Sequence, residues 1–243
     1  MEENVWNLVL DNTLKLPFVK VNRNAFLQEE LKLYCKPDEI EKAIKETPIQ
    51  IIDKEIISKI ADGCIKYHLH TVTATSALAG IPGGWWTFGT VPADLAQFYG
   101  QVFCIAQKLM YLYGWPDITD ENGMLDDDSK QILTLFAGVM LGVGLANKAL
   151  NELQKEFVKQ LVKRLPRMAL SKNSFYNITK TVARWIGIRL TKEGFANSLG
   201  KLVPIIGAGI SGALTYYTFK PMAKRLKKHC EQSWDFRTKN FKV

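Results

Sequence analysis

The stretch from Gly80 to Trp115 restricts the possible folds of this chain more than any other. It begins inside an uncharged run over 71–93, which is interrupted by Pro82, Gly83, Gly84, Gly89 and Pro92. Proline removes a backbone donor and breaks a helix interior, so this run is not expected to form one continuous membrane-spanning helix. We expect a turn rich in proline and glycine instead, with Trp85, Trp86 and Phe88 beside it.

A helix is predicted between Pro92 and Gly114. Proline is favourable in a first turn, Asp94 suits the positive end of the helix, and glycine commonly follows a last turn. The apolar side chains share one face, at Leu95, Phe98, Tyr99, Val102, Ala106, Leu109 and Tyr113. The polar side chains form a second stripe, at Asp94, Gln97, Gln101 and Lys108. Asp94, Gln97 and Gln101 are therefore candidate binding residues.

Hydrophobic residues recur with a helical period over most of the 243 residues, which predicts an all-α multi-helix bundle in a single domain over 1–243. A second apolar segment, Leu202–Phe219, also starts with a proline and a glycine-rich turn, so the two segments are candidates for a pseudo-symmetric pair. The short PIQIID run at 48–53 is a candidate strand, and the acidic LDDDS run predicts a helix start at Ser129.

Two uncharged stretches raise the question of membrane insertion. Gln131–Asn147 contains Gly138 and Gly142 at GxxxG spacing, which permits close helix approach in a membrane or in a bundle. Because a spanning helix needs about 20 residues, a buried hairpin is favoured for this stretch. Leu202–Phe219 just reaches spanning length and is the strongest transmembrane candidate.

Charge and cysteine content limit the setting of the protein. Lys and Arg total 32 against 24 Asp and Glu, a net charge of +8, which suits an anionic partner such as a lipid surface, nucleic acid or an acidic protein. The acidic start MEENVWNLVL does not resemble a secretory signal. Four cysteines stand far apart without metal-ligand spacing, so we expect reduced thiols, no metal site and a cytoplasmic location.

The chain becomes strongly basic from about residue 220. Its cations include Lys224, Arg225, Lys227 and Lys228, and aromatic residues are interleaved at Trp234, Phe236 and Phe241. Such a segment can bind an anionic bilayer, each cation contributing about 1 kcal/mol near the surface, or it can be an ordinary solvated helix end. Nucleic acid is less favoured because no recognised binding motif accompanies the charge.

Catalytic motifs are missing from the sequence. There is no phosphate-binding GxxxxGKS/T loop, no GxSxG elbow and no HExxH helix. His68 and His70 would point to different sides of a helix. Asp94 is the acid whose setting could shift its pKa, although backbone amides at a helix start explain it as well. We therefore expect a protein without a cofactor and favour a non-enzymatic role.

The stretch PGGWWTFGTVPADLAQFYGQVFCIAQKLMYLYGW resembles the EcsC family pattern of a Pro-Gly turn, an aromatic loop, Pro-x-Asp and a helix ending in Leu-Tyr-Gly. LVPIIGAGISGALTYYTF is similar to that family's second Pro-Ile-Gly-Ala-Gly segment. Helical domains attached to certain bacterial GTPases are more remotely similar. The resemblance implies a bacterial helical protein of poorly defined function, linked to an ABC-transporter operon. By position it marks Pro82, Gly83, Pro92, Asp94, Tyr113, Gly114, Pro204, Gly207 and Ala208.

Three functions follow as hypotheses. The first is a non-enzymatic accessory or scaffold protein, peripheral at the inner face of the cell membrane, that binds an anionic lipid surface or a membrane protein. The second is a soluble protein-interaction or regulatory module that uses Trp85, Trp86 and Phe88 as an anchor patch. The third is a lipid-binding or hydrolytic pocket around Asp94, bordered by Gln97 and Gln101.

Overall fold

The computed structural model describes residues 2–79, 87–88, 91–119, 124–160, 173–190 and 210–240, with side chains over 3–74, 95–119, 124–155, 174–190 and 216–232. Its helices are α1 (Glu2–Leu14), α2 (Arg23–Leu31), α3 (Pro37–Lys45), α4 (Pro48–Ile51), α5 (Lys54–Ala79), α6 (Ala93–Leu112), α7 (Asp127–Met140), α8 (Gly144–Gln160), α10 (Asn173–Leu190) and α12 (Ile210–Asn240). A two-residue antiparallel pair, β1 (Thr87–Phe88) and β2 (Val91–Pro92), precedes α6. The predicted all-α multi-helix bundle is confirmed.

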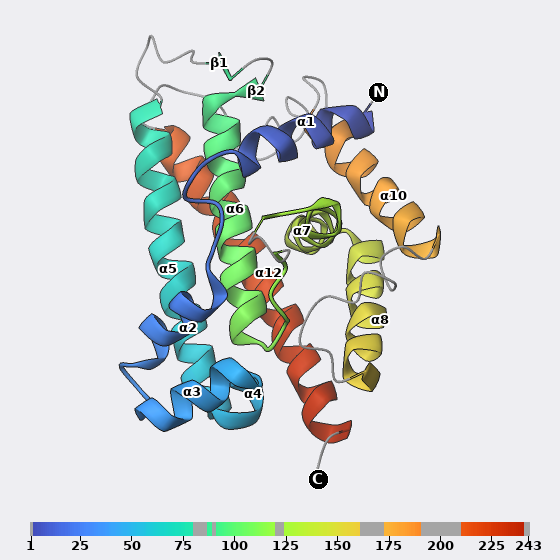
Figure 1. Cartoon of the computed structure of the whole chain (residues 1–243). Helices are drawn as coiled ribbons and strands as arrows, with labels where there is room; N and C mark the ends of the chain where they lie inside the picture. Colours follow the sequence, from blue (N-terminus) through green and yellow to red (C-terminus); the bar gives the residue numbers. More distant parts are fainter. Residues whose placement is uncertain are drawn as a thin grey trace.

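The long helices pack around a shared centre (Figure 1). α5, α6 and α12 run side by side, and α7 lies between them and the pair formed by α8 and α10. α1 crosses one end of the bundle from α6 to α10. The short helices α2, α3 and α4 cover the other end, against α5 and α6. α6 is thus enclosed by neighbours on several sides.

α6 follows the predicted boundaries closely. It begins directly after Pro92, and Gly114 takes a positive φ of 79° just beyond its last turn. The Trp115 amide then donates to the Met110 carbonyl at 2.9 Å, which closes the helix end. Side chains on all sides of its middle are buried, including the polar Gln101. Of the predicted polar stripe, Gln101 therefore faces neighbouring helices, while Gln97 and Lys108 are half-buried.

The uncharged stretch 131–147 forms two helices with a break between them, since α7 ends at Met140 and α8 begins at Gly144. Its two glycines have different roles. A Cβ on Gly138 would lie 2.7 Å from Val182 Cγ1 and 2.8 Å from Ala146 Cβ, so this glycine permits close packing of α7, α8 and α10. Gly142 has φ +84° and lets the chain turn after α7.

Two local predictions are wrong. The 48–53 run contains the helix α4 and not a strand, because Pro48 suits a first helical turn and the run is too short for its apolar pattern to decide. The helix predicted to start at Ser129 starts at Asp127, with Asp126 as its cap. The Asp126 carboxylate accepts from the Ser129 amide at 2.9 Å, so the acid caps the helix and the serine completes the capping box.

The second Pro/Gly segment is described only from Ile210 onward, where α12 begins, and residues 201–209 with Pro204, Gly207 and Ala208 lie outside the described residues. Its pairing with the Gly80 segment stays a prediction. Among the helices that the structure describes, none combines the length and the apolar character needed to cross a bilayer.

Candidate functional site

The predicted turn residues Pro82, Gly83, Trp85 and Trp86 lie outside the described residues. Asp94 is in the first turn of α6, where its backbone is described and its side chain is not. The anchor-patch hypothesis and the role of Asp94 therefore stay predictions. The structure describes the side chains of the other predicted site residues, which are Gln97, Gln101, Lys224, Arg225, Lys227 and Lys228.

Gln101 makes a buried polar contact between α6 and α5. Its Oε1 lies 2.7 Å from Nδ1 of His68. An amide oxygen can only accept, so with this amide orientation Nδ1 carries the proton and Nε2 holds the lone pair. Nε2 of His68 is buried and has no hydrogen-bond partner in the described part of the chain. Gln97, one turn earlier, is half-buried.

Two histidines are held neutral by burial. Desolvation, together with the nearby cation Lys108, lowers the pKa of His68 to about 4. On α12, burial alone lowers the pKa of His229 to about 4. His70, two residues beyond His68, is exposed, which confirms that the two point to different sides of α5. Both buried rings are therefore uncharged at neutral pH and belong to the core.

Gln107 is a buried residue that the sequence did not single out. Its Nε2 donates to the carbonyl oxygens of Val19 at 2.7 Å and Phe103 at 3.0 Å, and its Oε1 accepts from the Val21 amide at 3.2 Å. These contacts fix the loop between α1 and α2 along α6. A glutamine in an apolar helix was the available signal, but its loop partner is distant in sequence.

Lys227 links α12 to α5 and takes part in a polar cluster around Glu231. Its Nζ lies 2.7 Å from Oδ1 of Asp62 on α5 and 3.6 Å from Oε1 of Glu231 on α12. The same Glu231 oxygen accepts from Ser58 Oγ at 3.2 Å and from Tyr113 OH at 3.3 Å. Burial, together with Glu231, raises the pKa of Tyr113. This predicted lipid-binding cation is thus engaged in internal contacts among α5, α6 and α12.

Arg225 also has an internal partner. Its Nη1 donates to the carbonyl oxygen of Met140 at 2.9 Å, at the end of α7. Cations are favourable at this negative end of a helix. The guanidinium also lies close to Gly142, whose backbone turns the chain toward α8. Arg225 therefore stabilises the α7–α8 turn, even though part of its side chain is exposed.

Lys224 and Lys228 are the two predicted cations that remain directed to solvent. Both are exposed, and neither ammonium has an acidic partner among the described residues. Tyr217, seven residues before Lys224 on the same helical face, is 73% exposed. Tyr217, Lys224 and Lys228 thus form an outward stripe on α12, which we call the α12 stripe.

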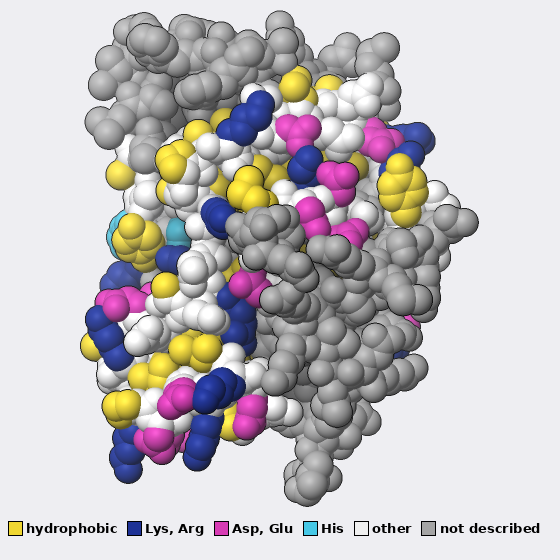
Figure 2. Space-filling view, viewed as in Figure 1, with side chains coloured by type: hydrophobic (Ala, Val, Ile, Leu, Met, Phe, Trp, Pro, Cys, Tyr) yellow, Lys and Arg dark blue, Asp and Glu magenta, His cyan; other side chains and the backbone are white. Residues whose placement is uncertain are grey.

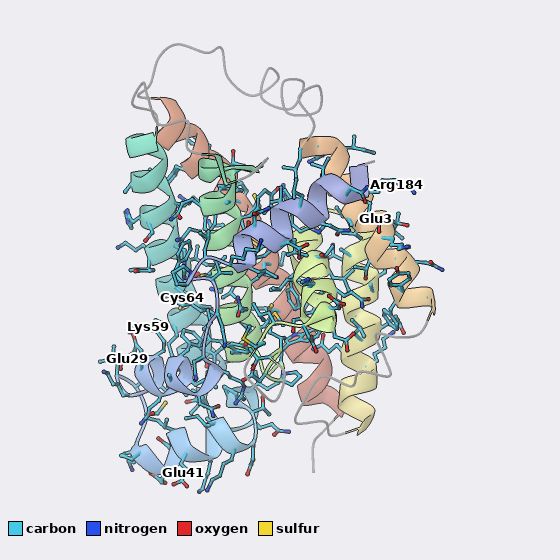
Figure 3. The ribbon with its side chains drawn as sticks, turned by 45° about the horizontal axis from the view of Figure 1, so that its top comes forward. Glu3, Glu29, Glu41, Lys59, Cys64 and Arg184 are labelled. Carbon is cyan, nitrogen blue, oxygen red and sulfur yellow. The ribbon has the colours of Figure 1, made fainter. Side chains whose placement is uncertain are left out.

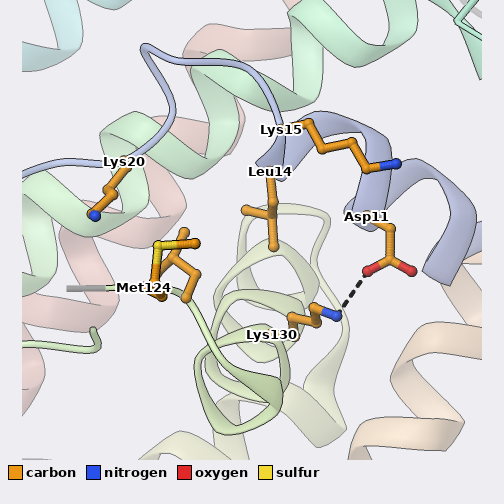
Figure 4. A pocket seen from close by; sticks show the side chains of 7 residues that line it. Asp11, Leu14, Lys15, Lys20, Met124 and Lys130 are labelled. Atoms are coloured by element: carbon orange, nitrogen blue, oxygen red, sulfur yellow. Dashed lines mark ion pairs between the residues drawn. The ribbon is translucent and has the colours of Figure 1, made fainter. Parts of the chain in front are cut away.

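A surface hollow of about 370 Å³ lies away from all of these residues, between α1, the loop after it and α7 (Figure 4). Its cations are Lys15, Lys20 and Lys130, and its apolar wall is formed by Leu14, Met124 and Leu125. Lys130 is neutralised by carboxylates, at 2.9 Å from Asp11 and 3.3 Å from Asp127. Lys15 and Lys20 are thus the cations of the hollow that have no ion pair with a described acid.

Neither a search for metal-ligand clusters nor comparison with known proteins assigns a function to the chain. No cluster of three or more His, Cys, Asp and Glu suited to a metal ion occurs within the described residues, and the four cysteines are free. The described part of the chain is a helical bundle with an apolar core, a few buried polar contacts and the outward α12 stripe. Comparison with protein-family models, with curated proteins and with solved structures finds no match for it.

Proposed function

We propose that this chain is a non-enzymatic accessory or scaffold protein of the EcsC type, which associates from the cytoplasmic side with an anionic membrane surface or with a membrane protein. The α12 stripe is the observation that carries this proposal. Tyrosine is favoured at the membrane interface because its ring is apolar and its hydroxyl is polar. Lys224 and Lys228, which have no acidic partner among the described side chains, add about 1 kcal/mol each next to an anionic surface.

The non-enzymatic character is supported by the way the core uses its polar groups. His68 pairs with Gln101, Gln107 binds the backbone, and Glu231 joins Lys227 and Tyr113. Each of these groups stabilises a contact between elements. A catalytic acid or base instead needs access to a substrate and a pKa near the working pH.

Vesicle co-flotation tests the proposal. Purified chain would be mixed with vesicles of phosphatidylglycerol and phosphatidylcholine, or of phosphatidylcholine alone, at low and high salt. We expect flotation with the anionic vesicles that weakens with salt, and weaker flotation of Lys224→Gln/Lys228→Gln. The matched control is Lys42→Gln/Lys148→Gln, which removes the same charge from exposed positions on α3 and α8.

Equal flotation of both double variants would mean that net charge, and not the α12 stripe, drives binding. If the unmodified chain fails to float under every condition, membrane association is wrong and the protein-interaction module becomes the leading function.

A further inference from the structure

The outward side of α10 carries an unusual set of side chains. Tyr176, Lys180, Arg184 and Ile188 follow one another at four-residue steps and are all exposed. Each four-residue step turns about 40° around the helix axis, so the four side chains form an oblique row about 18 Å long, across about a third of the helix surface. Ile188 is 47% exposed and Tyr176 is 46% exposed, which places a large apolar side chain at each end. We call this row the α10 stripe.

The orientation of α10 is fixed by its other side. Phe175, Val182 and Ile186 are buried, and α10 packs against α1, α7 and α8. At Gly138 the backbone of α7 comes so close that a Cβ there would lie 2.7 Å from Val182 Cγ1. This packing fixes the rotation of α10 and leaves Tyr176 and Ile188 on its exposed side.

The charge of α10 has one sign. The helix contains three cations and no acidic residue. Two of them lie over aromatic rings, with Lys180 Nζ 4.5 Å from the Tyr176 ring centre and the Arg189 guanidinium 3.9 Å from that of Trp185. Glu3 of α1 is the acid beside this face, near Arg184 (Figure 3). Among the described side chains, Glu3 thus faces the cations of α10 from α1, and α10 itself contributes no acid.

At the opposite end of the bundle, exposed lysines form ion pairs with glutamates that are close in sequence. On α2 and α3, Lys32 pairs with Glu29 at 2.5 Å and Lys45 pairs with Glu41 at 2.6 Å. Basic and acidic side chains are intermixed there (Figure 2). Those cations have anionic partners within their own helix, whereas Lys180 and Arg184 are directed to solvent from a helix without acids.

We infer that the α10 stripe is a second contact site for an anionic bilayer, at which Lys180 and Arg184 bind lipid phosphates while Tyr176 and Ile188 enter the headgroup region. This inference rests on the proposed membrane function and adds a surface that the basic C-terminal segment does not contain. Lys180 and Arg184 are one turn apart in the middle of this row and can both face a flat anionic surface, and the exposed isoleucine favours a lipid boundary over a fully polar polyanion.

Site-specific fluorescence separates this inference from the proposed function. The background variant is Cys35→Ser, which removes the cysteine that is not fully buried. In this background, single cysteines are introduced as Ile188→Cys, Tyr217→Cys or Leu33→Cys. Each is labelled with an environment-sensitive nitrobenzoxadiazole dye. Leu33 is 72% exposed at the α2–α3 turn and is the control. With phosphatidylglycerol/phosphatidylcholine vesicles, we expect a blue shift at position 188 and none at position 33.

A charge variant tests the same point by affinity. Lys180→Gln/Arg184→Gln should weaken partitioning to these vesicles by roughly fivefold per cation, about thirtyfold for the pair. Lys42→Gln/Lys148→Gln should change it much less. Circular dichroism and thermal unfolding would show that the exposed substitutions leave the fold intact.

Two results would overturn the inference while the proposed function stands. One is a vesicle response at position 217 with none at position 188, and the other is equal partitioning of the α10 variant and the matched control. Binding to heparin that requires Lys180 and Arg184, without any dye response to vesicles, would assign the α10 stripe to a soluble polyanion. Failure of the unmodified chain to bind vesicles would overturn both proposals together.

Discussion

The centre of the bundle and its outer basic helices both place polar side chains among apolar ones, but their partners differ. In the centre, Gln107 satisfies two carbonyl oxygens and an amide of its own chain. On the outer helices, Lys180 and Lys228 are exposed, and no ion pair joins either ammonium to an acid among the described side chains. The comparison suggests that the centre specifies the fold, while the outer stripes are suited to an external anion. Changes in the centre should therefore affect stability, and changes in the stripes should affect binding.

Acid should destabilise the centre most. His68 and His229 have a folded-state pKa lowered to about 4, below the ordinary value of 6.5, so the unfolded chain binds more protons between these values. Stability is therefore complete above pH 6.5 and falls as the pH drops toward 4, by about 2 kcal/mol per histidine at pH 5. Urea unfolding at pH 7 and pH 5 would measure the loss.

The matched variants are His229→Leu and His68→Gln, each of which should remove its own share of this loss. His70→Gln changes an exposed ring and should leave the pH dependence as it is. If all three variants lose stability with acid as the unmodified chain does, buried histidines are not the cause and the centre is less closed than the structure indicates.

Removing the Gln107 contacts should cause the next largest loss of unfolding free energy. Gln107→Met keeps the volume but leaves the Val21 amide and the Val19 carbonyl buried without this partner, at a cost of about 3 kcal/mol. Gln97→Met, on a half-buried position of the same helix, should change the unfolding free energy by less than about 1 kcal/mol. Equal losses for both variants would show that the loop is held by packing alone.

Glycine substitutions test whether close packing extends to α7, α8 and α10. Gly138→Ala forces its Cβ against Val182 and Ala146, and we expect a loss of about 2 kcal/mol in unfolding free energy. Gly63→Ala on α5 has open space around the new methyl group and should gain about 0.5–1 kcal/mol from helix propensity. Ala146→Gly in the Gly138→Ala background should restore part of the loss.

The sequence predicted the helical class and the limits of α6, because Pro92 and Gly114 act through local backbone chemistry. It also placed His68 and His70 on different sides of α5, since helical period alone decides that. It could not tell that Gly138 packs helices while Gly142 turns the chain, because both glycines fit one GxxxG pattern. That distinction depends on which helices the fold brings together.

The sequence identified some residues of the candidate site, but it did not identify the partners that those residues contact. Gln101 was selected by its position on the polar stripe, yet its partner His68 comes from another helix. The basic run 224–228 gave no sign of which cations are engaged, since Asp62 and the Met140 carbonyl belong to distant segments. The α10 stripe carries no motif, and only the packing of Phe175, Val182 and Ile186 against neighbouring helices shows which side of α10 is exposed.

The smallest expected change in unfolding free energy distinguishes two kinds of cation on α12. Lys227 has internal partners, whereas Lys224 and Lys228 are exposed. Lys227→Met keeps an apolar stem but loses the contacts to Asp62 and Glu231, which are partly solvent-screened, so we expect a loss of about 1 kcal/mol. Lys224→Gln/Lys228→Gln should change the unfolding free energy by less than about 0.5 kcal/mol while weakening vesicle flotation. Urea unfolding and flotation of the same preparations would compare the two. If Lys227→Met lowers flotation as much as the double variant without altering stability, its ammonium serves the membrane surface, and the division between structural and surface cations fails.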